Sequence, residues 1–232
     1  MTPAERPLGT VLVTGGASGL GAAVATAVTK AGGTAVVLDR VAPPADLDHT
    51  LVDLADTRAA EAACRRAAER HGGLQGVVTA AGIDACGKLA DVPTADWERV
   101  VAVNLLGTAA VVRAALPFLE RTRGTVVTIG STLGLRALPD ATAYCASKFG
   151  IVGFTRALAA ETAGRVGVTL LVPGGMRTAF FDGRPAQYRP APDAQLNHPD
   201  DVAEAVLFAL RQPVGCEVRE LVVAPSTETS WP

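Results

Sequence analysis

A tyrosine and a lysine stand four residues apart, at Tyr144 and Lys148, in a stretch whose composition favours a helix. Residues at this spacing lie on one helical face, so we expect the phenol and the ammonium to be neighbours. A free phenol has a pKa of about 10, and a positive charge a few ångströms away favours phenolate and lowers that pKa. The pair is therefore a candidate general acid and base. A surface pair on an amphipathic helix is the alternative.

A glycine turn precedes an expected helix near the start of the chain. Residues 10–13 form a short apolar run, Thr14 to Gly21 read T-G-G-A-S-G-L-G, and an alanine-rich helix should follow to about residue 31. Glycines let backbone amides approach a pyrophosphate, and a helix N-terminus favours its negative charge. The spacing G-x-x-x-G-x-G is not the commoner fingerprint G-x-G-x-x-G. A tight structural turn remains the alternative for this segment alone.

An acidic residue ends the next expected strand, at residues 34–38. Asp39 stands 18 residues after Gly21, where an acidic side chain commonly holds the adenosine ribose hydroxyls. Its carboxylate would repel the 2′-phosphate of NADP, which favours NAD. Arg40 opposes this preference, because a guanidinium there could accept the phosphate.

Length and composition favour a globular, soluble protein. The 232 residues, 49% hydrophobic and 19% charged, fit one domain with a large core. A net charge of −2 gives no electrostatic footprint for nucleic acid. The four cysteines match no metal-binding spacing, so we expect reduced, mostly buried thiols and no metal. We find no secretory signal and no run of 18 uncharged apolar residues, which predicts a cytoplasmic protein without a membrane span.

Strands and helices alternate along the rest of the chain. Further strands are expected at 50–52, 76–79, 125–129, 166–172 and about 220–223, and helices at about 57–70, 97–120, 144–163 and 200–211. Such alternation predicts an α/β fold, a Rossmann-like, doubly wound parallel sheet between two helical layers, in a single domain of residues 1–232. Ligands bind outside the carboxyl ends of such strands, where Asp53, Ala81, Gly82, Ser131, Pro173 and Gly174 stand.

With these residues considered together, the chain resembles the short-chain dehydrogenase/reductase family over about residues 9–224. The family's T-G-x-x-x-G-x-G and Y-x-x-x-K motifs are complete, and Ser131 stands thirteen residues before Tyr144. N-x-x-G is present at Asn104, and P-G-x-V-x-T is present at 173–178 with Met176 for valine. One motif departs from the family pattern. Where the family has N-N-A-G or N-A-A-G, this chain has T-A-A-G, which begins at Thr79. We expect Thr79 to supply one hydrogen bond in place of the missing asparagine.

The resemblance implies reversible hydride transfer between nicotinamide C4 and the carbon of a secondary alcohol or ketone. It implies that Tyr144 is the general acid and base and that Ser131 donates a hydrogen bond to the substrate oxygen. Lys148 would lower the tyrosine pKa and hold the nicotinamide ribose, and Asn104 would hold a water that links Lys148 to solvent. The residues implied for binding NAD, or less favourably NADP, are Gly15, Ser18, Gly19, Leu20, Asp39, Arg40, Asp53, Leu54, Ala81, Gly82, Tyr144, Lys148, Pro173, Gly174, Met176 and Thr178.

Two of these cofactor residues have a structural alternative. Met176 could equally be a core side chain. Asp53 could be a helix N-cap or a turn residue.

Residues 177–199 have no clean periodicity, and so long a stretch in a compact domain is usually a functional lid. Ile83, Ser131, Leu133, Phe180, Phe181 and Tyr188 are expected to line an apolar substrate pocket, with a plain surface loop as the alternative. Arg136 and Arg184 are expected to be solvated surface charges, with an acidic substrate group as the alternative partner.

Helices near 99–119 and 144–160 are apolar on more than one face, which favours a homodimer or homotetramer. The tail from Ser226 to Pro232 is expected to be frayed, with docking on a neighbouring subunit as the alternative. A small-molecule alcohol or carbonyl substrate is the expected partner. Two other functions stay open at this point: a non-catalytic dinucleotide-binding regulator or scaffold, and an isomerase or dehydratase on the same fold.

Overall fold

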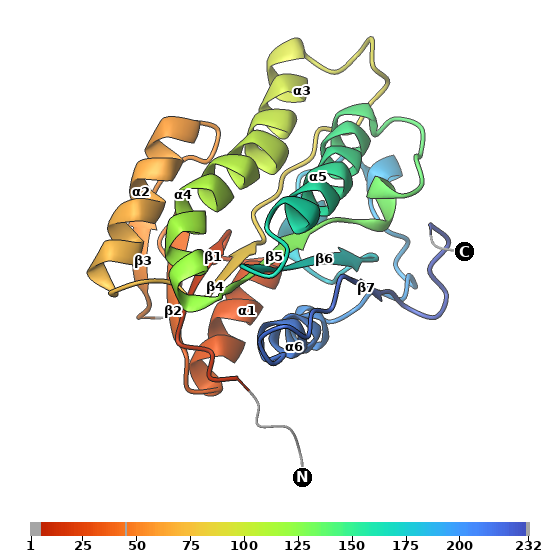
Figure 1. The fold of residues 1–232 in the computed structure, drawn as a ribbon. Coiled ribbons are helices and arrows are strands. Elements are labelled where there is room, and N and C mark those ends of the chain that lie inside the picture. The colour runs from red at the N-terminus through yellow and green to blue at the C-terminus, as the bar shows by residue number, and fades with distance from the viewer. Residues whose placement is uncertain (1–5, 45, 231–232) are drawn as a thin grey trace.

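The computed structural model describes residues 6–44 and 46–230, which form a twisted parallel sheet between two layers of helices (Figure 1). The strands lie in the order β3-β2-β1-β4-β5-β6-β7. Their bounds are β1 Thr10–Thr14, β2 Thr34–Asp39, β3 Asp48–Leu51, β4 Gly76–Thr79, β5 Thr125–Ile129, β6 Gly167–Pro173 and β7 Glu220–Val223. All neighbouring pairs among these strands are parallel, as in a Rossmann-like, doubly wound fold.

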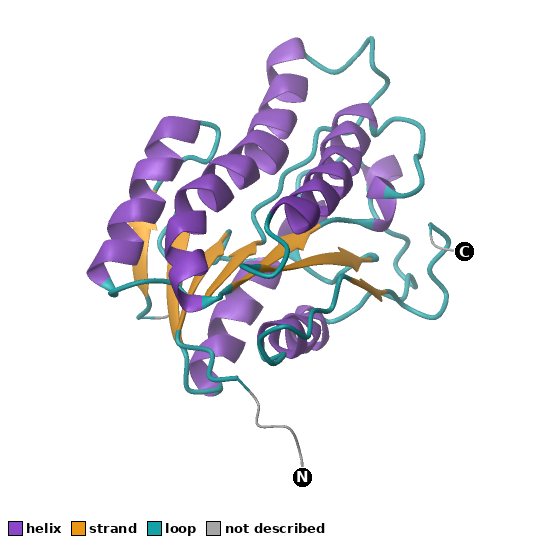
Figure 2. Cartoon of the chain, viewed as in Figure 1, coloured by secondary structure: helices purple, strands orange, loops and turns teal. Residues whose placement is uncertain are grey.

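Helices cover both faces of the sheet (Figure 2). The helices are α1 Gly19–Lys30, α2 Thr57–Arg70, α3 Thr94–Val101, α4 Thr108–Thr122, α5 Thr142–Glu161 and α6 Pro199–Leu210. Helices α1 and α6 pack on one face, where Val13 and Val37 lie in one apolar cluster with Val24 and Val206. Helices α2, α4 and α5 cover the other face. Two-sided burial explains why the central strands read as continuous apolar runs.

The expected elements are confirmed, with shifts at their ends. Strand β3 starts two residues earlier than expected, and α5 spans Thr142–Glu161 instead of 144–163. The long helix expected at 97–120 is interrupted by a π-helical turn, η1, at Ala102–Gly107. This stretch is apolar on more than one face, so a shift in the phase of its apolar pattern was not visible in the sequence. Such turns are frequent at functional sites, and this one carries Asn104.

The prediction for Thr79 is wrong. Its hydroxyl is buried and has no hydrogen-bond partner among the described residues. Neighbouring strands are instead linked through Thr14, whose hydroxyl accepts a hydrogen bond from the amide of Ala81 at 3.2 Å. The fold tolerates the loss of the family's asparagine at this position, at the cost of one orphaned hydroxyl.

The helical stretch Thr94–Thr122 is long and apolar enough to cross a membrane by length and composition, and it is the one such helix among the described residues. Its apolar window is 56% buried within the protein. A core helix that packs on a sheet has the same properties, so this is a weak indication of a membrane span.

Candidate active site

The glycine turn after β1 forms a cradle at the start of α1. Gly15 and Gly19 have φ of 72° and 52°, a backbone region that favours glycine. A Cβ on Gly15 would lie 2.7 Å from the Cα of Ala81, so only glycine lets the segment after β4 approach this turn. Ser18, the N-cap of α1, makes no capping hydrogen bond with its side chain. The amides of the first helical turn are thus available to an anion, and the cradle fits a dinucleotide pyrophosphate.

Asp39 lies beside this cradle at the end of β2. Its carboxylate accepts hydrogen bonds from the amides of Ala17, at 2.9 Å, and Val41, at 3.2 Å. The first of these bonds ties the carboxylate directly to the glycine turn. Arg40, next to it, is exposed.

Asp53 makes the turn contact that was one of its two expected roles. One oxygen accepts from the amide of Ala55 at 3.0 Å, which is a turn contact, and the other pairs with Arg99 at 2.8 Å. The Ala55 amide and the Arg99 guanidinium together lower the pKa of this carboxyl. Asp53 also lines the large pocket at the carboxyl ends of the strands.

Ser131, Tyr144 and Lys148 come together where β5 ends beside α5. The Nζ atom of Lys148 donates to the carbonyl of Ile129 at 2.8 Å and lies 5.6 Å from the centroid of the Tyr144 ring. Ser131 caps the short helical turn η2 (Thr132–Gly134), and its hydroxyl accepts from the amide of Leu133 at 3.1 Å. The lysine and serine side chains are buried, with residues 4% and 8% exposed.

The electrostatics of this group differ from the sequence expectation. Burial raises the pKa of Tyr144 to about 12, although a hydrogen bond with Ser131 acts to lower it. Burial likewise lowers the pKa of Lys148 to about 8. The net direction of the Tyr144 shift is therefore opposite to the one predicted from the neighbouring Lys148. Loss of water around the phenol outweighs the neighbouring charges.

Asn104 is buried and does not line the pocket. Its Oδ1 accepts from the amide of Ile83 at 2.8 Å, while Nδ2 donates to the carbonyl of Ile83 at 2.9 Å and to the Ser147 hydroxyl at 3.0 Å. These contacts fasten the segment after β4 to helix α5. Asn104 therefore holds the Ile83 backbone against the residue that precedes Lys148 in α5.

One pocket of about 1270 Å³ lies along the carboxyl ends of the strands. Every residue that the sequence proposed for catalysis, cofactor or substrate lines this pocket, with Asn104 the exception. Met176 does so while also packing against the core, so both of its expected roles are compatible with the structure.

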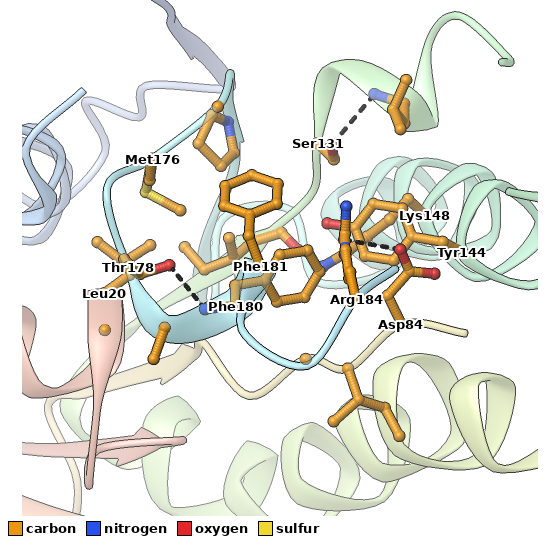
Figure 3. A pocket seen from close by; sticks show the side chains of 18 of the residues that line it. Leu20, Asp84, Ser131, Tyr144, Lys148, Met176, Thr178, Phe180, Phe181 and Arg184 are labelled. Atoms are coloured by element: carbon orange, nitrogen blue, oxygen red, sulfur yellow. Dashed lines mark hydrogen bonds and ion pairs between the residues drawn. The ribbon is translucent and has the colours of Figure 1, made fainter. Parts of the chain in front are cut away.

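The segment at residues 177–199 covers part of the pocket beside Tyr144 (Figure 3). It contains two short 3₁₀ turns, η3 Ala179–Phe181 and η4 Ala186–Tyr188. The Phe180 ring lies 5.5 Å from the Tyr144 ring, and the Phe181 ring lies 5.6 Å from that of Phe180. Tyr188 donates to Asp140 at 3.2 Å. This packing matches the expectation of an apolar pocket wall.

The expectation of a solvated Arg184 is wrong. Its side chain is 16% exposed and forms a 2.7 Å ion pair with Asp84, whose side chain is 6% exposed. Asp84 was not recognised from the sequence, where it is one of many carboxylates and lies 100 residues before its partner. Arg136 is exposed, as expected, and donates to the carbonyl of Thr229 at 3.3 Å.

The expectation of a frayed tail is wrong for its described part. Glu228 accepts from the amide of Gly175 at 2.9 Å, and the Ser230 hydroxyl lies 2.7 Å from that of Thr132, the residue after Ser131. Residues 227–230 thereby form one wall of the pocket. No periodicity or motif marked this contact, and Trp231 and Pro232 lie outside the described residues.

Comparison with known proteins agrees with this geometry. The short chain dehydrogenase family matches residues 9–189. A curated relative, 2-(S)-hydroxypropyl-CoM dehydrogenase 3 of Xanthobacter autotrophicus, is 36% identical and aligns with 86% of this chain and 88% of its own. An uncharacterised oxidoreductase of Staphylococcus aureus is 34% identical, over 92% of this chain and 96% of its own.

Solved structures show the same fold. Ligand-free aldohexose dehydrogenase of Thermoplasma acidophilum superposes with a TM-score of 0.84, at 24% identity, covering 93% of this chain and 92% of its own. An alcohol dehydrogenase of Thermococcus sibiricus, complexed with 5-hydroxy-NADP, superposes with a TM-score of 0.83 at 24% identity. The match covers 93% of this chain and 95% of its own. The family match, the curated relatives and the shared fold agree: the chain belongs to the short-chain dehydrogenase family of NAD(P)-dependent oxidoreductases.

Proposed function

We propose that the protein transfers a hydride between a nicotinamide and the carbon of a secondary alcohol or ketone, with Tyr144 as general acid and base. The observation that carries this proposal is the convergence of Tyr144, Ser131 and Lys148 on the pocket that also contains the glycine cradle. The name of the Xanthobacter relative adds support, since a 2-hydroxypropyl group is a secondary alcohol.

The dinucleotide would be held by the glycine turn and the first turn of α1, with Asp39 at the adenosine ribose. When bound, the nicotinamide supplies the hydride acceptor or donor. The remaining chemistry is movement of one proton at the substrate oxygen, and that is the task of the protein's own side chains.

Tyr144 would carry that proton on its phenolic oxygen, accepting it in alcohol oxidation and donating it in ketone reduction. The Ser131 hydroxyl would donate a hydrogen bond to the substrate oxygen and hold it beside the phenol. Lys148 would hold the nicotinamide ribose, and Asn104 would fix the Ile83 backbone against α5 and hold a water on the route from Lys148 to solvent.

We infer a preference for NAD over NADP. The Asp39 carboxylate is tied to the glycine turn, so it would face the 2′ position of the adenosine ribose. A 2′-phosphate there would be repelled by a fixed negative charge. The exposed Arg40, the next residue, could offset part of that repulsion.

The segment at residues 177–199 would act as a substrate lid, since its aromatic rings pack directly on Tyr144. Residues 1–232 would form one domain that works in the cytoplasm as a homodimer or homotetramer. Leu106 and Phe149 support the assembly, because they are 50% and 45% exposed on helical segments that need only one apolar face to cover the sheet.

The test is the absorbance of reduced nicotinamide during incubation with NAD or NADP and a panel of secondary alcohols, and with the reduced cofactors and the matching ketones. Turnover of any member that disappears in Tyr144→Phe would support the proposal. Tight cofactor binding without Tyr144-dependent turnover across small, hydroxylated, sugar and steroid alcohols would contradict it and favour the non-catalytic regulator.

A further inference from the structure

The Asp84–Arg184 ion pair lies inside the substrate region of the pocket (Figure 3). Asp84 comes from the segment after β4 and Arg184 from the lid, so the pair joins the lid to the body of the site. The guanidinium carbon of Arg184 lies 4.7 Å from the ring centroids of both Phe180 and Phe181. These contacts fix the orientation of the guanidinium.

Arg184 has more donors than the described residues use. A guanidinium carries five N–H groups. One donates to Asp84 at 2.7 Å and one to the carbonyl of Tyr188 at 3.4 Å, while the buried Nε has no partner. The Nε atom is enclosed by protein, so the donors left for a ligand are the second N–H groups of Nη1 and Nη2.

The spare donors are near the reacting centre. Phe180, which contacts the guanidinium, also packs on the Tyr144 ring at 5.5 Å. The charges of Asp84 and Arg184 both act on the pKa of Tyr144, in opposite directions. A substrate whose carbinol oxygen meets Tyr144 would therefore extend its next few atoms toward Arg184.

The charge of the arginine is already compensated. Asp84 is held in place, because one of its oxygens accepts from the amide of Ala85 at 2.7 Å and the other from the Cys86 thiol at 3.0 Å as well as from Arg184. A substrate anion would bring a second negative charge next to a buried carboxylate. An uncharged oxygen would accept the hydrogen bond without that repulsion.

We propose that Arg184, oriented by Asp84, is a specificity-determining residue that donates a hydrogen bond to a second, uncharged oxygen of the substrate. The substrate class is then a secondary alcohol with a further hydroxyl or carbonyl close to the carbinol carbon. This proposal rests on the function proposed above and narrows its substrate.

The experiment compares kcat/KM for 2-butanol, 2,3-butanediol, 1,3-butanediol and 3-hydroxybutyrate. The wild-type enzyme should favour the better diol over 2-butanol by about tenfold or more, the value of one hydrogen bond to a charged group. Arg184→Met should abolish this preference while turnover of 2-butanol persists. Because Arg184→Met leaves Asp84 buried without its partner, the double variant Arg184→Met/Asp84→Asn provides a folded comparison.

Two further variants sharpen the result. Asp84→Asn keeps the guanidinium and removes the compensating charge, so it should improve kcat/KM for 3-hydroxybutyrate relative to the diols by about tenfold. Arg177→Met is the matched control, because Arg177 is an exposed lid arginine outside the pocket, and it should leave all ratios unchanged. A diol preference that survives in both Arg184 variants would overturn the proposal. So would a wild-type preference for 3-hydroxybutyrate.

Binding separates this proposal from the proposed reaction. Calorimetry of the same alcohols with the Tyr144→Phe enzyme and NAD needs no turnover. Tighter diol binding that depends on Arg184 supports the specificity proposal even if no oxidation occurs. Equal binding of 2-butanol and both diols refutes it even if Tyr144-dependent oxidation is observed.

Discussion

The ammonium of Lys148 lies 5.6 Å from the centroid of the Tyr144 ring and donates to the carbonyl of Ile129, and the lysine is only 4% exposed. Burial lowers the pKa of Lys148 from 10.5 to about 8 and raises the pKa of Tyr144 from 10.0 to about 12. Burial thus disfavours the charged form of each group, although at pH 7 a lysine with a pKa of about 8 still mostly carries its proton. This electrostatic cost should be visible in stability as well as in catalysis.

Lys148 should make a contribution to stability that increases as the pH rises above about 8. Between its native pKa of about 8 and its ordinary value of 10.5, the unfolded chain holds a proton that the folded chain has lost. The contribution of Lys148 to the free energy of unfolding therefore increases with pH through this window, by up to about 3 kcal/mol in total. Cys64 and Cys86 oppose it above about pH 9, because burial raises the pKa of both thiols to about 12 and the unfolded thiols ionise first. Tyr144 has the opposite effect only above pH 10, where the unfolded phenol ionises first.

Urea unfolding between pH 7 and 9.5 measures this slope. Lys148→Met should make this slope less positive or more negative than in the wild type, whereas Lys30→Met, at an exposed lysine at the end of α1, should not change it. An equal slope in Lys148→Met and the wild type would show that the buried ammonium does not carry the pH dependence.

Thr79→Val should leave stability unchanged or raise it by about 1 kcal/mol. The Thr79 hydroxyl is buried without a partner among the described residues, so its removal relieves a desolvation cost. Thr128→Val is the matched comparison, since the Thr128 hydroxyl lies 2.7 Å from that of Thr155. It should lower the free energy of unfolding by about 1 kcal/mol. Thermal unfolding of the two variants should give shifts of different size or sign, and equal destabilisation would mean that Thr79 has an unseen partner.

Asp39→Asn should narrow the preference for NADH over NADPH by about tenfold. Asparagine can still accept the hydrogen bond from the Ala17 amide, so the turn survives while the charge that opposes a 2′-phosphate is removed. Asp46→Asn, at an exposed position outside the pocket, controls for the change in net charge. Fluorescence titration with both reduced cofactors gives the ratio of dissociation constants. If Asp39→Asn and Asp46→Asn leave the same ratio, Asp39 does not set the cofactor preference.

The sequence was sufficient for the fold and for most of the pocket because the relevant residues follow local rules. Tyr144 and Lys148 are one helical turn apart, and the glycines and Asp39 stand at strand ends that a parallel sheet must bring to one edge. Each of these placements depends on spacing within a single element or on the order of the strands.

What could not be predicted depends on tertiary packing. The π-helical turn around Asn104 lies in a stretch that is apolar on more than one face, which hides its phase shift, and nothing local indicates that Thr79 lacks a partner. The pairing of Asp84 with Arg184 and the docking of Ser230 on Thr132 join residues about a hundred positions apart. The pKa of Tyr144 was predicted in the wrong direction because spacing indicates the neighbouring charge but not the loss of water.

The central claim is that the Tyr144 hydroxyl carries the proton of the reaction, and it is tested most directly by comparing Tyr144→Phe with Tyr188→Phe. These are the only two tyrosines of the chain, and both line the pocket. For Tyr144→Phe we predict an NADH dissociation constant within about twofold of the wild type and a kcat lower by about a hundredfold or more. The kcat of Tyr188→Phe should fall far less than that of Tyr144→Phe. Wild-type turnover in Tyr144→Phe, with cofactor binding intact, would contradict the account.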